Sequence, residues 1–288
     1  FVEQDLQQES AEFALVIGSG KIGQSYLHWR GDRLFQLPVS WLHESDSWIN
    51  SPGFPDGRAN FERPIIARCL ECHSTYFQSP QHDNNIHGRT DFVLGISCER
   101  CHGPGAQHIE AQQAAAVEGA PHITHPGDLS RERLIDVCAQ CHSDTGDPIQ
   151  APFTFRPGDD IRLFYAEPEE GVGGVHAANQ VGRMQASACY QNSDMTCVTC
   201  HDPHVFERGD TAGFSAKCQT CHQVDVCSMG PELGEAIVDN CIDCHMPRRE
   251  DAHTQIQDAS GGLAFPLMPE HRVGIYADAT EVFLRSLE

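Results

Sequence analysis

Six copies of the pattern Cys-x-x-Cys-His run through this chain of 288 residues. On one turn of helix, residues i, i+3 and i+4 lie on the same face. Two thiols at this spacing can form thioethers with the edge of a haem while the adjacent imidazole reaches its iron, which is the attachment pattern of c-type haem. Six matches predict six covalently attached haems c. The thioether cysteines would be Cys69, Cys72, Cys98, Cys101, Cys138, Cys141, Cys197, Cys200, Cys218, Cys221, Cys241 and Cys244, and the proximal iron ligands His73, His102, His142, His201, His222 and His245.

Paired cysteines also occur in zinc sites, where four ligands form a tetrahedron. Zinc gives no reason for a histidine directly after every pair, and six pairs would make three all-cysteine sites with six histidines unused. A disulfide scaffold fits less well, because Cys-x-x-Cys pairs form redox-active bridges rather than structural ones. The pattern therefore favours haem over both alternatives.

Two cysteines, Cys189 and Cys227, lie outside the motifs. Covalent haem attachment needs thiols in a compartment outside the cytoplasm, where disulfides also persist. A disulfide between them would close a loop that contains two motifs. The alternative is a pair of buried free thiols, and the sequence leaves both open.

The chain begins without an initiator Met or a leader-like segment, so we expect that a signal peptide has been removed. No apolar stretch approaches the length that spans a bilayer. These features predict an exported protein without a membrane span, in the periplasm or at the cell surface and extracellular.

The formal charge of −22 arises from 41 acidic against 19 basic residues. Such a field repels nucleic acid and anionic membranes, which we exclude as partners. It suits basic redox proteins or extracellular mineral and cation surfaces, although the charge also serves solubility.

Six haems would leave 48 residues for each, and the chain carries 25 Gly and 17 Pro. We therefore expect a mainly irregular chain with short α-helices, in which the haems form the core, as in small domains that depend on a cofactor. The expected parts are a haem-free, β-rich region at 1–60, a hexahaem cytochrome c domain at 61–273, and a C-terminal helix at 274–288.

Local patterns predict strands at 13–17 and 34–41, and helices at 106–117, 130–142 and 278–287. The glycines from Gly18 to Gly23 match a dinucleotide-binding fingerprint, but Gly31-Asp32 interrupts the helix and strand that such a unit requires. We interpret them as a tight turn. The motif starts are separated by 29, 40, 59, 21 and 23 residues, which is too irregular for a solenoid.

Eleven histidines outside the motifs exceed the six needed for a second axial ligand on every iron. His204 lies three residues after His201. Because a chain spans at most about 3.3–3.6 Å per residue, His204 cannot pass around its own porphyrin and would bind a neighbouring haem. His108 follows His102 through glycines that allow close approach of the backbone. The predicted distal ligands are His108, His204, His271, His176, His253 and His87, with His43 and His82 in reserve and His28, His122 and His125 expected to be structural.

Several segments resemble a group of multihaem cytochromes c often fused to TPR repeats, related to periplasmic tetrahaem carriers and to extracellular cytochrome filaments. The resemblance rests on residues 18–27 (GSGKIGQSYL), 33–41 (RLFQLPVSW), 98–108 (CERCHGPGAQH), 189–204 (ending CVTCHDPH) and 240–247 (NCIDCHMP). It implies that His108 and His204 are distal ligands and that His271 matches a histidine of the group's C-terminal motif.

The chain departs from this group in two respects. Group members usually carry another haem motif ahead of the GSG block and a TPR segment after the cytochrome, and neither is present here. We therefore expect either a missing N-terminal piece or a reduced form that takes contacts from a neighbour.

Two classes of function compete. An electron carrier keeps both axial positions of each iron filled, whereas a redox enzyme acting on nitrite, hydroxylamine or sulfur compounds needs one open iron site. No lysine-bearing variant of the motif is present and histidines are in excess, so electron transfer is favoured. The carrier would be a discrete shuttle or a head-to-tail polymer, an extracellular wire, built through an interface that does not close.

Overall fold

The computed structural model describes residues 2–4, 7–18, 20–54, 60–82, 84–114, 119–143, 146–166, 179–251, 254, 256–257 and 262–287. The chain forms two compact units, Phe1–Val172 with Ala252–Pro266 and Gly173–Asp251 with Leu267–Glu288. Unit 1 contains the first three motifs and unit 2 the last three. The division falls inside the region 61–273 that we expected to form one haem domain.

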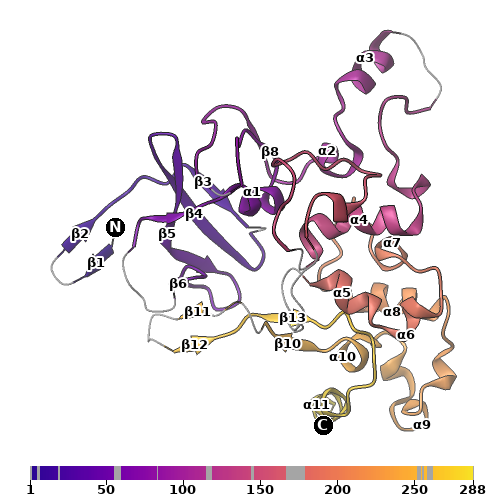
Figure 1. Cartoon of the computed structure of the whole chain (residues 1–288). Coiled ribbons are helices and arrows are strands. Elements are labelled where there is room, and N and C mark those ends of the chain that lie inside the picture. The colour runs from indigo at the N-terminus through magenta and orange to yellow at the C-terminus, as the bar shows by residue number, and fades with distance from the viewer. Residues whose placement is uncertain are drawn as a thin grey trace. The chain divides into compact units, whose positions relative to one another are not determined.

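An antiparallel sheet forms the N-terminal part of unit 1 (Figure 1). Strands β3 (Leu15–Ile17), β4 (Gly23–Arg30), β5 (Arg33–Leu42) and β6 (Ser47–Asn50) follow one another in this order, and β7 (Arg63–Pro64) pairs with β5. The sheet is a simple meander, because each of these strands up to β6 pairs with the next along the chain. Strands β3 and β5 confirm the strands predicted at 13–17 and 34–41.

The turn between β3 and β4 depends on glycine. Gly18 has φ of +113°, and a Cβ atom there would lie 2.3 Å from the carbonyl oxygen of Gly23. Only glycine fits this conformation without displacing the opposite backbone. A strand rather than a helix follows these glycines, which agrees with a turn and not with a dinucleotide-binding unit.

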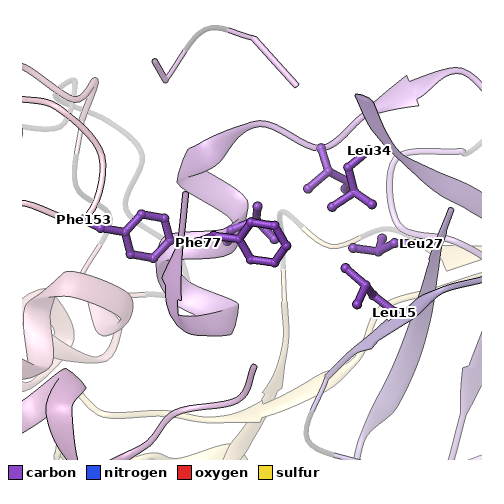
Figure 2. Close-up of a cluster of buried hydrophobic side chains, with 7 residues drawn as sticks. Leu15, Leu27, Leu34, Phe77 and Phe153 are labelled. Carbon is purple, nitrogen blue, oxygen red and sulfur yellow. The ribbon is translucent and has the colours of Figure 1, made fainter. Parts of the chain in front are cut away.

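A small apolar core joins the sheet to the first motif (Figure 2). Leu27 and Leu34 of the sheet are fully buried, and Leu70, inside the first motif, is 1% exposed. Burial of each such side chain is worth about 1.5–3 kcal/mol. Unit 1 therefore has a side-chain core of its own, beyond what we expected from the sequence, and this core ties the sheet and first motif into one unit. The cluster consists of Leu15, Leu27, Leu34, Ile65, Leu70, Phe77 and Phe153.

The remainder of unit 1 consists of short elements. Helix α4 begins after Ser130, whose hydroxyl accepts a hydrogen bond from the Arg133 backbone N–H (3.3 Å), which confirms the predicted cap. The helix predicted from Ala106 is present and is described as far as Ala114. The elements are α1 (Ala67–His73), β8 (Ser74–Phe77) paired with β9 (Phe92–Leu94), α2 (Cys98–His102), α3 (Ala106–Ala114), α4 (Arg131–His142), the 3₁₀ turns Pro126–Asp128 and Ile161–Leu163, and the small pairs β1 (Val2–Gln4) with β2 (Gln7–Glu9) and β11 (Ile256–Gln257) with β12 (Leu263–Ala264).

Unit 2 is built from short helices and one pair of strands. None of the helices in the described ranges of either unit is long and apolar enough to cross a bilayer. The elements of unit 2 are α5 (Gln180–Gln185), α6 (Ala188–Gln191), α7 (Cys197–Cys200), α8 (Thr211–Gln219), α9 (Gly230–Leu233), α10 (Ile242–His245), α11 (Ala277–Ser286), the 3₁₀ turns Val224–Val226 and Gly234–Ile237, and β10 (Arg248–Glu250) paired with β13 (Leu267–Pro269).

Helix α11 confirms the amphipathic helix predicted at 278–287. Ala279 and Phe283 are buried, whereas Val282 is exposed. The Asp278 carboxylate in its first turn accepts two hydrogen bonds from the Arg249 guanidinium on β10. This ion pair links the beginning of the helix to β10.

Candidate haem-attachment sites

Every motif is associated with a turn of helix, as the spacing predicts. The first three motifs lie within α1, α2 and α4. In each of the last three, the histidine backbone N–H donates to the carbonyl of the first cysteine, which closes one helical turn around the motif. These bonds are His201 to Cys197 (2.9 Å), His222 to Cys218 (2.9 Å) and His245 to Cys241 (3.0 Å).

Two motif histidines have a hydrogen bond that prepares the ring for a metal. His102 Nδ1 lies 2.8 Å from the Thr124 carbonyl oxygen, and His245 Nδ1 lies 2.7 Å from that of Gly274. A carbonyl only accepts, so Nδ1 carries the proton and the lone pair of the neutral ring is on Nε2. Metal-binding histidines usually have this second hydrogen bond, which sets the tautomer and the ring orientation.

Three histidines outside the motifs show the same pattern, and all three are among the predicted distal ligands. In each, Nδ1 faces an oxygen acceptor, so the tautomer with the lone pair on Nε2 is favoured. The pairs are His108 with the Pro121 carbonyl (3.0 Å), His204 with the Asp202 carboxylate (3.1 Å) and His271 with the Pro269 carbonyl (3.0 Å).

Three other histidines have the opposite arrangement, with Nε2 donating to a backbone carbonyl. These bonds are His28 to Phe61 (3.0 Å), His82 to Gln150 (2.7 Å) and His87 to Ile65 (2.7 Å). A proton on Nε2 occupies the nitrogen that would otherwise bind iron. The Nε2 atom of His28, which we expected to be structural, is engaged in this way.

His87, which we predicted to bind iron, has the same arrangement at Nε2. Its Nδ1 lies 2.7 Å from the Ser79 hydroxyl, so both ring nitrogens have protein partners, and the residue is only 3% exposed. Burial lowers the pKa of His87. The sequence could not reveal this, since the partners at Ile65 and Ser79 meet the ring only in the folded chain.

The remaining candidates carry less structural information. His43, His122 and His125 are exposed. His176 and His253, both predicted distal ligands, lie outside the described residues.

The structure also brings together two predicted ligands that are far apart in sequence. The rings of His201 and His271 in unit 2 have their centres 6.3 Å apart, with an angle of 26° between their planes. The Nδ1 atom of His201 faces Glu207, 3.8 Å from its carboxylate.

In unit 1 the first and third motifs are in direct contact through their second cysteines. Cys72 Sγ lies 3.5 Å from the Gln140 carbonyl, and Cys141 Sγ lies 3.8 Å from the Glu71 carbonyl. The two thiols also interact with each other, which lowers the pKa of Cys72 to about 7 and raises that of Cys141. Haems attached to these two motifs would therefore be joined to the protein at neighbouring points.

The same contact contains a buried polar cluster that sequence reasoning missed. The residue before the second cysteine is Glu71, Arg100 and Gln140 in the first three motifs, and each is at most 7% exposed. Arg100 donates to the Glu71 carbonyl at 2.6 Å. Glu71 Oε2, Arg100 Nε and Gln140 Oε1 have no hydrogen-bond partner among the described residues, which is uncommon for buried polar atoms. All six motifs carry a polar residue at this position, so the sequence alone does not single out these three.

The surface beside the motifs fits a large apolar cofactor. Many of the exposed large apolar side chains lie within a few residues of a motif, where a porphyrin would cover them. Exposed apolar patches on proteins usually mark binding sites. A covalently attached haem requires thiols for its thioethers, imidazoles with an Nε2 lone pair for its iron, and apolar side chains against its porphyrin. The surface beside the motifs supplies all three. These apolar residues are Tyr76, Val93, Leu94, Ile96, Ile109, Val198, Val205, Phe206, Val226 and Val238.

The two cysteines outside the motifs are both free thiols and half-buried. The disulfide that we considered between Cys189 and Cys227 is therefore absent from the structure, and the free-thiol alternative is the one observed.

Comparisons with known proteins support the same interpretation. The family model described as cytochrome c554 and c-prime matches residues 39–103, which contain the first two motifs. The multihaem cytochrome MtrA of Shewanella baltica is 24% identical over 188 residues, which cover 62% of this chain and 45% of the relative. The polyhaem cytochrome OmcC of Geobacter sulfurreducens is 26% identical over 176 residues, 50% of this chain and 22% of the relative. This chain thus spans less than half the length of either relative.

Among solved structures, the outer cell wall cytochrome OcwA superposes with a TM-score of 0.57 and 17% identity, covering 91% of this chain and 67% of that one. At this identity the likeness concerns the fold. With the motifs, the sequence relatives and this fold, the chain is a multihaem c-type cytochrome.

Proposed function

We propose that the chain carries six haems c and passes electrons along them outside the cytoplasm. The twelve motif cysteines would hold the porphyrins and the six motif histidines would bind iron from one side. The haems would supply one-electron chemistry, the iron alternating between ferric and ferrous. The residues of the chain orient the imidazoles and surround the cofactors with apolar side chains.

The observation that carries this proposal is the orientation of the spare histidines. His108, His204 and His271 each have Nδ1 beside an oxygen acceptor, as do the motif residues His102 and His245. A ligand on the second side of an iron needs this tautomer. These three are the distal ligands that we propose from the structure, and His176 and His253 remain proposals from the sequence. His87 is left out because both of its nitrogens are engaged.

Filled axial positions favour electron transfer over catalysis, since an enzyme must leave one iron position open to its substrate. The experiment is to count haems in the purified holoprotein by mass and then expose the reduced protein to CO. We expect six haems and a spectrum that CO leaves unchanged. A CO complex on one haem in every chain would instead support the alternative, a multihaem redox enzyme with one open site.

The proposed partners are redox proteins or extracellular acceptors of positive charge. The net charge of −22 favours such partners by attraction over distance. We further propose that copies of the chain associate head to tail into a filament. Negative-stain microscopy of concentrated holoprotein should show fibres, and a field of single particles alone would remove the polymer from the proposal.

A further inference from the structure

We propose that His201 and His271 are the two axial ligands of a single haem iron, and that the Arg183–Glu270 ion pair and Ser187 position His271 for this role. The inference rests on the proposed function, which requires a second imidazole on each iron. It assigns one distal histidine to one particular motif, the fourth, and identifies residues that act through that histidine.

The spacing of the two rings is the first support. A metal–imidazole nitrogen bond is about 2 Å long, and the atoms of a five-membered ring lie about 1.2 Å from its centre when its bonds are about 1.3–1.4 Å. Two imidazoles on opposite sides of one metal ion thus have ring centres about 6.4 Å apart. The observed separation of His201 and His271 is 6.3 Å. The angle between the planes is unrestricted, because each ring can rotate about its metal–nitrogen bond.

A second pair shows that spacing alone is not sufficient. The rings of His102 and His125 are 6.5 Å apart, but the chain excludes them as a pair on one iron. His102 Nδ1 donates to the Thr124 carbonyl, so Thr124 lies on the side of the ring away from Nε2. The centre of the His125 ring can lie at most about 6 Å from the Thr124 carbonyl oxygen, because His125 is the next residue. The ring centre of a second imidazole, on the opposite side of an iron bound by His102, would lie about 10 Å from that oxygen. No such restriction applies to His201 and His271, which are 70 residues apart in sequence.

The way His271 is held is the second support. Its neighbour Glu270 is 2% exposed, and the carboxylate receives two hydrogen bonds from the Arg183 guanidinium on α5, one of them Nε to Oε1 at 2.9 Å. Glu270 Oε1 also accepts from the Arg272 backbone N–H at 2.7 Å. A two-pronged Arg–carboxylate contact fixes orientation as well as distance. The residues on both sides of His271 are therefore fixed by the same buried carboxylate.

Ser187 holds the same segment from a second point. This residue is 1% exposed, and its hydroxyl lies 3.1 Å from the His271 carbonyl and accepts a hydrogen bond from the Val273 backbone N–H at 2.8 Å. His271 thus belongs to a segment whose backbone is tied to α5 and to the residue that precedes α6. Such support around a ligand is what keeps an imidazole in position for a metal.

The segment also serves the sixth motif. Gly274 accepts the Nδ1 proton of His245 at 2.7 Å, and its backbone N–H lies 3.2 Å from the His245 carbonyl. Residues 270–274 would therefore provide the distal ligand of the fourth haem and orient the proximal ligand of the sixth. The two haems are linked by one short stretch of backbone.

The direct test is His271→Ala in the full holoprotein. Quantified EPR of the oxidised variant should show one high-spin iron of the six, and that haem should bind CO after reduction. Added imidazole should restore the low-spin signal, and His271→Met should raise the potential of one haem, as methionine ligation does. His125→Gln is the matched control, because it removes an exposed histidine with a similar ring spacing and should change no spin state.

The assignment to the fourth haem is tested by removing that haem. In a Cys197→Ser, Cys200→Ser chain, His271→Ala should add no high-spin iron. If it still creates one, His271 binds a different haem and the pairing is wrong. If this chain does not fold, the single variant His271→Met, which keeps all six haems, allows the same test. The haem whose potential changes should be the one whose proximal ligand is identified by NMR as His201.

The positioning role is tested with Arg183→Met and Arg183→Lys. Arg183→Met should convert a fraction of the fourth haem to high spin and shift its potential, and Arg183→Lys should restore only part of the low-spin signal, because an ammonium group keeps the charge but not the two-pronged contact. Arg285→Met is the control, since it removes an exposed Arg–carboxylate pair of the same unit, Arg285–Glu281 within α11, and should leave all spin states unchanged. A low-spin Arg183→Met protein with unaltered potentials would overturn the positioning role.

These outcomes separate the inference from the proposed function. A wild-type protein with an open iron site contradicts the proposed function. A wild-type protein that is fully low-spin, with a His271→Ala variant that remains fully low-spin, contradicts only the assignment of His271.

Discussion

Replacing Ser187 by Ala should release the segment that carries His271, and the size of the effect follows from the hydrogen bonds of the Ser187 hydroxyl. The substitution removes the acceptor for the Val273 N–H and the donor to the His271 carbonyl. Leaving a buried polar group unpaired costs about 1–3 kcal/mol. The population of molecules with this segment detached should thus rise about 5–150-fold.

The assay is the rate at which CO binds to the fully reduced holoprotein. CO can reach the fourth iron only when His271 has left it, so the rate for one haem in six should increase by the same factor as the detached population. The increase should be absent in chains that carry Arg285→Met alone, since the exposed Arg285–Glu281 pair lies within α11.

Ser193→Ala provides a closely matched control. The Ser193 hydroxyl also donates to a carbonyl, that of Cys189 at 2.6 Å, and accepts from a backbone N–H, that of Met195 at 3.2 Å. Ser193 is exposed, so water can replace the hydroxyl as a partner and the CO rate should not change. Equal CO rates in the wild-type, Ser187→Ala and Ser193→Ala proteins would refute the reasoning.

Three further predictions concern other parts of the molecule. His87→Gln should lower the thermal midpoint, because it disturbs a buried ring with two partners, yet create no high-spin iron in EPR; a new high-spin centre would restore His87 as a ligand. Hydrogen bonds from Arg249 lower the pKa of the Asp278 carboxyl to about 2, against about 3.9 when the chain is unfolded. The stabilising effect of this carboxylate is therefore complete above about pH 4 and is lost as the pH falls to about 2. The thermal midpoints of Asp278→Asn and wild type should differ at pH 7 and converge near pH 2, and a constant difference would contradict this. A chain with all twelve motif cysteines replaced by serine should retain slow hydrogen exchange in β4 and β5, which have a side-chain core, and lose it in α7 and α10; equal protection in both units would contradict this.

Local features of the sequence predicted the local structure well. Ser130 identified the start of α4 because a hydroxyl cap acts within three residues, and the glycines at 18–23 identified a turn because only glycine tolerates its backbone angles. The spacing of the cysteines and the histidine within each motif predicted a helical turn for the same reason. In each case the determining contacts lie a few residues apart.

The parts that could not be predicted depend on contacts between distant residues. Which nitrogen of a histidine is available is decided by carbonyls far along the chain, such as that of Ile65 for His87 and that of Gly274 for His245. The apolar core of unit 1 likewise combines Leu15 with Phe153, 138 residues later. The composition predicted that haems would fill the interior. It missed the apolar core of unit 1 because a composition does not show which apolar residues meet in the fold.

The central claim is that imidazole binds each of the six irons on both sides, and EPR spin quantification of the oxidised, purified holoprotein tests it most directly. The account predicts six low-spin ferric centres per chain and no high-spin signal above trace level. One full equivalent of high-spin iron in the untreated wild-type protein would contradict it.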